Sequence, residues 1–147
     1  MMPEIQINFV AILVATIAGF FLSFLWYTPL FGKAWAKEMG FDYSEKPPAS
    51  AMAKSLLLTV FSVFLIAFVL SSNIAAWTPS TWGATKFSIA KTEQALQAGI
   101  FTWLGFFVSN LLQGVAWEKR SWKLFAIDAG YYLALLLLIS FIIVYMR

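Results

Sequence analysis

Long apolar runs alternate with short polar stretches along the whole chain. The apolar runs cover about residues 5–27, 51–77, 95–117 and 121–146. A helix of about twenty apolar residues is long enough to cross the hydrocarbon core of a bilayer. The pattern therefore predicts an all-α fold, an integral membrane bundle of four transmembrane helices, with residues 1–147 forming a single transmembrane domain.

The polar segment at residues 28–50 predicts one further, short helix. Its apolar residues are spaced like one side of a helix, with charged residues opposite, and are Phe31, Ala34, Trp35, Met39 and Phe41. Such a pattern is typical of an interfacial helix on the membrane surface, although a helix that only caps the bundle explains it equally well. We expect Pro29 to stop or kink the first span and Gly32 to form a turn.

Small residues recur at every fourth position in the first and last spans. The first set is Ala11, Ala15, Gly19 and Ser23, and the second is Ala126, Gly130 and Ala134. Because small side chains at this spacing let helix backbones approach closely, the two faces are predicted to pack against each other. Beyond Ala134 the last span is rich in Leu, Ile and Phe, and we expect it to face lipid.

Composition agrees with a membrane protein and argues against a nucleic-acid partner. The chain is 61% hydrophobic and 12% charged, whereas soluble domains carry about 25% charged residues. The net charge of +3 does not indicate nucleic-acid binding, because most basic residues flank the spans, where they determine topology. The lipid bilayer is the partner that this composition predicts.

The distribution of basic residues predicts an orientation. The first loop and the 118–123 turn share Lys33, Lys37, Lys46, Lys54, Lys119, Arg120 and Lys123, whereas the opposite side has Lys86, Lys91 and Arg147. Cytoplasmic loops carry the excess of Lys and Arg. We therefore expect the first and third loops in the cytoplasm and both termini outside.

Residue types limit the chemistry that the chain can perform. The sequence has no cysteine and no histidine, so the commonest metal ligand and the commonest general base are missing. Glu118 and Asp128 are ten residues apart, which is roughly 15 Å along a helix and too far to share one proton transfer. The sequence predicts no catalytic residue, no metal site, no cofactor and no enzymatic activity.

Asp128 is the candidate functional residue, because it is an ionisable side chain inside the fourth span. A charged residue at the centre of a spanning helix costs about 2.5–3.5 kcal/mol on insertion scales. Asn110 and Asp128 each lie about seven residues from the 118–121 turn, or roughly 10 Å deep, so they could bond each other. Gln113 is three residues after Asn110 and can share its helical face.

Other residues are expected to gather around Asp128 at the same end of the bundle. They are Trp35, Glu118, Arg120, Trp122 and Tyr131. Apolar walls with a few convergent polar groups are typical of small-molecule sites. Alternatively, Asp128 is structural and bonds Asn110, Tyr131 or the backbone, or pairs with Lys123 or Arg120. Terminal aromatics such as Trp26 and Tyr27 are expected in the interfacial belt.

Two motifs resemble those of a known bacterial membrane family. Trp-Tyr-Thr-Pro-Leu-Phe-Gly-Lys-Ala-Trp at residues 26–35 is similar to its first signature, and Glu-Lys-Arg-Ser-Trp-Lys-Leu-Phe at 118–125, followed by Asp-Ala-Gly-Tyr at 128–131, is similar to its second. The family is domain of unknown function 1761, and the resemblance implies four transmembrane helices in the bacterial cytoplasmic membrane. The family pattern often has Asn at the position of Asp128 and His at that of Tyr132.

The sequence leaves two functions open. One is a self-associating protein, a homo-oligomer, that binds or transports a small solute or lipid through the polar site near the cytoplasmic end. The alternative is an accessory or scaffold subunit of a larger membrane complex, for which close-packing faces and short loops are sufficient.

Overall fold

In the computed structural model, which describes residues 2–3 and 5–147, every regular element is a helix. The elements are α1 (Phe9–Leu25), the π-helical turn η1 (Trp26–Leu30), α2 (Gly32–Met39), α3 (Ala49–Trp77), the 3₁₀ turn η2 (Pro79–Trp82), α4 (Lys91–Thr102), the π-helical segment η3 (Trp103–Val108), α5 (Ser109–Trp117) and α6 (Trp122–Tyr145). Within that part of the chain, four continuous helical stretches are long and apolar enough to cross a membrane: Phe9–Leu30, Ala49–Trp77, Lys91–Trp117 and Trp122–Tyr145. The predicted all-α membrane bundle is confirmed.

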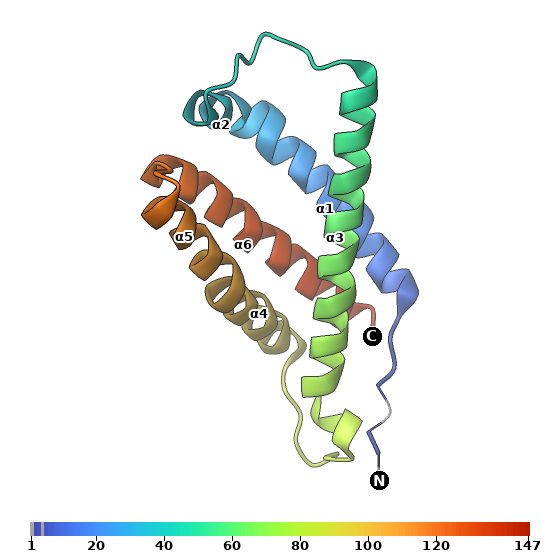
Figure 1. Cartoon of the computed structure of the whole chain (residues 1–147). Coiled ribbons are helices and arrows are strands. Elements are labelled where there is room, and N and C mark those ends of the chain that lie inside the picture. Colours follow the sequence, from blue (N-terminus) through green and yellow to red (C-terminus); the bar gives the residue numbers. More distant parts are fainter. Residues whose placement is uncertain (1, 4) are drawn as a thin grey trace.

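The loops and termini are divided between the two ends of the bundle (Figure 1). The termini and the connection between α3 and α4 lie at one end, and α2 and the α5–α6 turn lie at the other, called here the α2 end. The Asn8 side chain donates a hydrogen bond of 2.9 Å to the carbonyl of Met146, so the two terminal regions are in contact. The loops rich in basic residues therefore share one end, as the orientation argument requires.

α6 forms the centre of the bundle and packs against α1, α3 and α4. Leu135, Leu136, Ile139 and Ile143 are completely buried. The expectation that α6 faces lipid beyond Ala134 is therefore wrong. Composition could not reveal this, because leucine and isoleucine suit a lipid-facing surface and a helix–helix interface equally well.

The small residues of α1 face the other helices, and all four are buried. A Cβ atom placed on Gly19 would lie 2.6 Å from Val63 Cγ1 and 2.8 Å from Leu135 Cδ1, so this face approaches both α3 and α6 closely. On α6 the matching surface is formed by larger residues such as Leu135. Of the predicted second stripe, Ala126 is exposed, Ala134 is half-buried, and Gly130 lies against the ring of Trp26.

The short helix predicted in the first loop is α2, and it packs on the end of the bundle. Its Glu38 accepts a hydrogen bond of 2.5 Å from the hydroxyl of Ser121, which precedes α6. The regular α-helix of the first span ends at Leu25, and the π-helical turn that contains Pro29 extends the span only to Leu30. In this turn the Phe31 N–H donates to the Trp26 carbonyl at 2.8 Å. Gly32 begins α2 instead of forming a separate turn.

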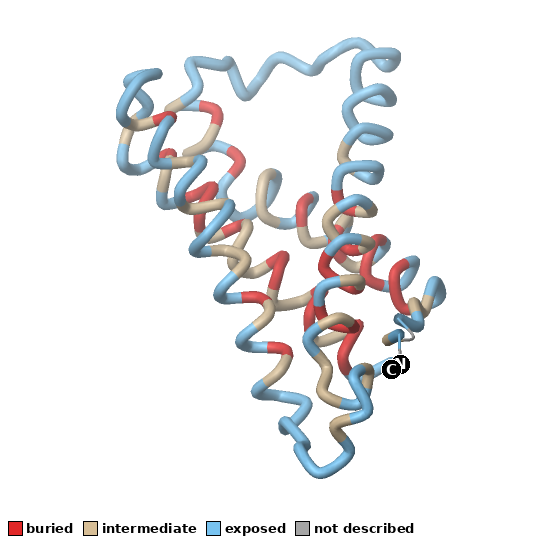
Figure 2. The backbone as a smooth tube through the Cα atoms, turned by 60° about the horizontal axis from the view of Figure 1, so that its bottom comes forward, coloured by how far each residue is buried: buried red, intermediate tan, exposed pale blue. Residues whose placement is uncertain are grey.

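The first half of α3 diverges from the rest of the bundle. Residues 49–62 are exposed except for the half-buried Thr59, whereas the second half packs against α1 and α6 (Figures 1 and 2). The divergence opens a space between α1 and α3 on the side of the α2 end.

Candidate functional site

Asp128 lies on α6 and faces the interior of the bundle at the α2 end. The helix begins at Trp122, capped by the Ser121 hydroxyl, which accepts a hydrogen bond of 3.0 Å from the Leu124 N–H. Asp128 is 9% exposed, and its Oδ1 accepts a hydrogen bond of 2.6 Å from the hydroxyl of Tyr27. Within the described residues, the Tyr27 hydroxyl is the hydrogen-bond donor to the Asp128 carboxylate. Most of the acceptor capacity of the carboxylate is therefore unused.

The π-helical turn η1 brings Tyr27 to Asp128. Pro29 lacks a backbone N–H and so cannot contribute to a regular helical hydrogen-bond ladder, and the wider turn extends from Trp26 to Leu30. The ring of Tyr27 packs edge-on against Trp35, with ring centroids 5.7 Å apart, and against Tyr131, at 5.0 Å. A short irregular turn of the helix thus holds the Tyr27 hydroxyl in place.

A second π-helical segment, η3, lies on the other side of Asp128. It begins at Trp103, whose indole Nε1 donates a hydrogen bond of 2.8 Å to the Ala129 carbonyl. In η1, Trp26 Nε1 donates one of 3.1 Å to the Ile127 carbonyl. The carbonyls on both sides of Asp128 are therefore held by tryptophans from the two π-helical segments. Such segments are rare and occur frequently at functional sites.

Asp128 lines a pocket of about 500 Å³ between these elements. Its walls come from η1, α2, η3, α5, the α5–α6 turn and α6, and consist of Tyr27, Trp35, Met39, Phe106, Phe107, Asn110, Leu111, Arg120, Asp128 and Tyr132. Half of these residues are aromatic, and Asp128, Asn110 and Arg120 supply the polar groups. This is the composition expected of a small-molecule site.

The structure brings only some of the predicted residues together. Trp35, Asn110 and Arg120 line the pocket with Asp128, but Asn110 makes no hydrogen bond to it in the described residues. Arg120 Nε pairs with Glu118 Oε2 at 2.7 Å, on a partly exposed surface. The remaining predicted residues lie outside the pocket: Gln113, Glu118 and Trp122 are exposed, and the buried Tyr131 hydroxyl bonds Ser23.

Sequence reasoning missed Tyr27, Tyr132 and Phe107. The position of Trp26 and Tyr27 at the end of a span predicts that both lie in the interfacial belt, yet both side chains donate hydrogen bonds to α6. Trp77, Trp82, Trp117 and Trp122 are largely exposed, as belt residues would be. The signal that could have identified Tyr27 is its motif, because the two motifs at residues 26–35 and 128–131 meet at this site.

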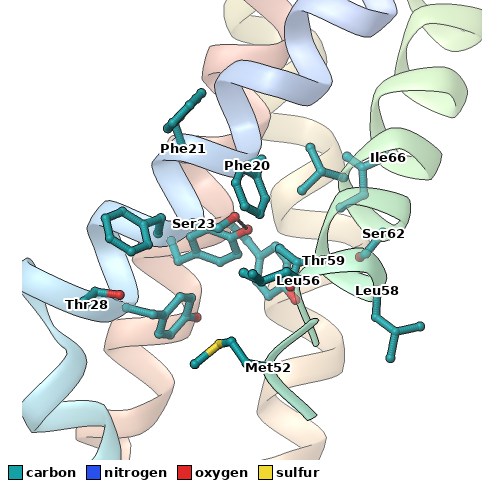
Figure 3. A pocket seen from close by; sticks show the side chains of 15 residues that line it. Phe20, Phe21, Ser23, Thr28, Met52, Leu56, Leu58, Thr59, Ser62 and Ile66 are labelled. Carbon is teal, nitrogen blue, oxygen red and sulfur yellow. Dashed lines mark hydrogen bonds between the residues drawn. The ribbon is translucent and has the colours of Figure 1, made fainter. Parts of the chain in front are cut away.

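A larger apolar cleft of about 970 Å³ adjoins the pocket (Figure 3). It lies between α1 and the diverging half of α3, with Phe20, Phe21, Leu56 and Ile66 among its walls. Tyr27 and Tyr132 line both the cleft and the Asp128 pocket. These two side chains therefore separate a lipid-facing space from a polar one.

The described residues contain no group of three His, Asp or Glu side chains that could hold a metal ion. The chemistry available at the pocket is that of one carboxylate, one amide, one guanidinium and phenolic hydroxyls. Such groups can bind a polar or charged solute between aromatic walls.

Comparisons with known proteins agree with this architecture. Searches of curated proteins and of solved structures gave no match. A comparison with protein families matched residues 10–144, nearly the whole chain, to the family described as "Protein of unknown function (DUF1761)". The matched region contains the four membrane-length helical stretches and leaves out only Phe9 at the start of the first and Tyr145 at the end of the last. The chain therefore belongs to the DUF1761 family.

Proposed function

We propose that this multi-pass membrane protein binds and transports a small solute through the Asp128 pocket, without enzymatic chemistry. We place it in the bacterial cytoplasmic membrane, with the α2 end in the cytoplasm and both termini outside. The observation that carries the proposal is a carboxylate inside a spanning helix that has Tyr27 as its donor in the described residues and faces a pocket of about 500 Å³.

The energetics favour a binding role over a structural one. A carboxylate kept in a spanning helix is expensive, and such residues usually pair with other groups or mark a substrate pathway. A purely structural carboxylate would be expected to have its oxygens occupied by protein donors. Asp128 instead lines the pocket with unused acceptor capacity, so a ligand in the pocket can supply the missing partner.

The test is the thermal stability of Asp128→Asn in detergent. The amide oxygen of asparagine can accept the Tyr27 hydrogen bond, and the substitution removes a charge that is costly in this environment. A binding role therefore predicts a melting temperature equal to or above that of the wild type, with transport or ligand binding lost.

Tyr27→Phe is the matched variant, because it removes the donor and retains the ring packing against Trp35. It should lower the melting temperature, since the carboxylate loses its protein partner. A clear loss of melting temperature in Asp128→Asn would contradict the proposal and identify Asp128 as a structural acceptor.

We further propose that copies of this chain self-associate, because one chain encloses little space for a transport path. The first half of α3 does not pack against the other helices of the chain, so it is available to a second copy and equally to the larger complex of an accessory subunit. The mass of the particle extracted gently from its own membrane distinguishes the two. A few copies of this chain alone would favour self-association, whereas a larger particle containing other chains would favour the accessory subunit.

A further inference from the structure

We propose that the solute held beside Asp128 is an organic ammonium cation, an alkylated amine of about the size of choline. This inference rests on the proposed binding function and names the chemical class of the ligand. It depends on three properties of the pocket, which are its aromatic walls, its charge and its volume.

Aromatic residues make up half of the lining of the pocket that contains the carboxylate. The rings that line the pocket belong to Tyr27, Trp35, Phe106, Phe107 and Tyr132. They hold one another in place: Tyr27 packs edge-on against Trp35 at 5.7 Å, and Phe107 lies 4.5 Å from Tyr132 between ring centroids. The electron-rich faces of such rings attract alkylammonium groups, and rings arranged around a charge form a cage for them.

The charge of the pocket is complementary to a cation. Arg120 also lines the pocket, but its Nε is paired with Glu118 at 2.7 Å, which offsets part of its positive charge. Of the two charged side chains that line the pocket, Asp128 is the buried one, and its charge is negative. A monovalent cation would neutralise it, whereas an anion would be repelled by it at close range and in a medium of low dielectric constant.

The pocket volume favours an organic ion over a bare inorganic one. A volume of about 500 Å³ lies in the range of sites for small organic molecules, about 300–1,000 Å³. A sodium ion would leave the aromatic walls without a partner. The methyl and methylene groups of an alkylammonium ion would pack against the aromatic walls, and its positive charge would attract the carboxylate.

The experiment compares three probes of nearly the same shape: choline, its neutral analogue 3,3-dimethyl-1-butanol and the anion 3,3-dimethylbutanoate. Binding to the full-length protein in nanodiscs made only of phosphatidylglycerol is measured by isothermal titration calorimetry at constant ionic strength. We expect choline to bind at least about tenfold more tightly than either analogue. Asp128→Asn should abolish the preference for choline.

Trp35→Leu tests the aromatic walls and has a matched control. It removes a ring that lines the pocket and should weaken choline binding several-fold while affecting the neutral analogue less. Trp117→Leu removes a ring that is 82% exposed and lies outside the pocket, so choline binding should be unchanged. A uniform loss in both variants would contradict the role assigned to the rings.

The remaining outcomes separate this inference from the proposed function. Equal binding of choline and the neutral analogue, lost in Trp35→Leu, would keep a solute site and overturn the ammonium class. Preference for the anion, lost in Arg120→Gln, would also overturn it. Failure of all three probes to bind would overturn the ammonium inference, and a destabilised Asp128→Asn would in addition overturn the binding function.

A lipid headgroup and a free amine share the chemistry of the site, and a second set of nanodiscs distinguishes them. Half of the lipid is replaced by phosphatidylcholine. If the headgroup enters the pocket through the adjoining cleft, free choline should bind more weakly by competition. If only a soluble amine enters, choline affinity should be the same in both nanodiscs.

Discussion

Buried polar side chains in the bundle differ in how their hydrogen-bonding capacity is used. Thr16 and Ser23 donate to carbonyls four residues earlier in α1, at 2.7 and 2.9 Å, which is a common arrangement inside apolar helices. Asp128 accepts a hydrogen bond from the Tyr27 hydroxyl and faces a pocket. Ser140 is completely buried, and its hydroxyl has no partner in the described residues. Asp128 and Ser140 both have unused hydrogen-bonding capacity, but of the two only Asp128 lines a pocket with space for a ligand.

Ser140→Ala should therefore stabilise the protein. A buried polar group without a partner costs about 1–3 kcal/mol, and removing the hydroxyl removes that cost. The melting temperature in detergent should rise by a few degrees. Ser72→Ala is the control, because the Ser72 hydroxyl donates a hydrogen bond of 3.0 Å to the Phe68 carbonyl. The melting temperature of this variant should not rise. A lower melting temperature for Ser140→Ala would show that the hydroxyl has a partner in solution.

The π-helical turn η1 and helix α2 act as one unit that presents Tyr27. The unit depends on Gly32, because a Cβ atom there would lie 2.6 Å from the Tyr27 carbonyl oxygen and 3.0 Å from the ring of Tyr43. The first of these neighbours is backbone and cannot rotate away. The glycine expected to form a turn is instead required by a close approach between two helical elements.

Gly32→Ala should move the Tyr27 backbone and weaken its hydrogen bond to Asp128. Overpacking of this kind costs about 1–3 kcal/mol, so the melting temperature should fall and choline binding should weaken. Gly105→Ala, in the other π-helical segment, adds a methyl group with no atom within 4 Å and should be tolerated. Equal stability of the two variants would contradict the close-approach argument.

At the scale of the whole molecule, α6 is surrounded by other helices and α3 is half detached from them. The central position of α6 places Asp128 in the interior, and the divergence of α3 leaves the apolar cleft beside it. Both loops rich in basic residues lie at the α2 end (Figure 1). The Asp128 pocket therefore lies near the side that we propose to be cytoplasmic.

The absence of cysteine from the sequence makes this orientation directly measurable. Ser44→Cys introduces a thiol in the exposed first loop, and Ser88→Cys introduces one in the exposed connection between α3 and α4. A membrane-impermeant maleimide should label Ser88→Cys in intact cells and Ser44→Cys only after permeabilisation. The opposite pattern would place the termini in the cytoplasm and the pocket on the outer side.

The number, type and approximate limits of the spans followed from the sequence, because a bilayer demands long apolar helices whatever they pack against. Asp128 could also be selected from sequence, since a charge in such a helix is conspicuous. The packing face of α1 was visible for the same kind of reason, because Ala11, Ala15, Gly19 and Ser23 form a regular pattern along one helix.

The partners of those elements were decided only by the tertiary structure. Depth counting placed Asn110 beside Asp128, but it could not show that the π-helical turn beginning at Trp26 brings Tyr27 into hydrogen-bond contact with Asp128 instead. Nor could composition show that α6 is central, since lipid and protein select the same apolar side chains. Hydrophobicity determines which segments enter the membrane, whereas shape and a few hydrogen bonds determine which faces meet inside it.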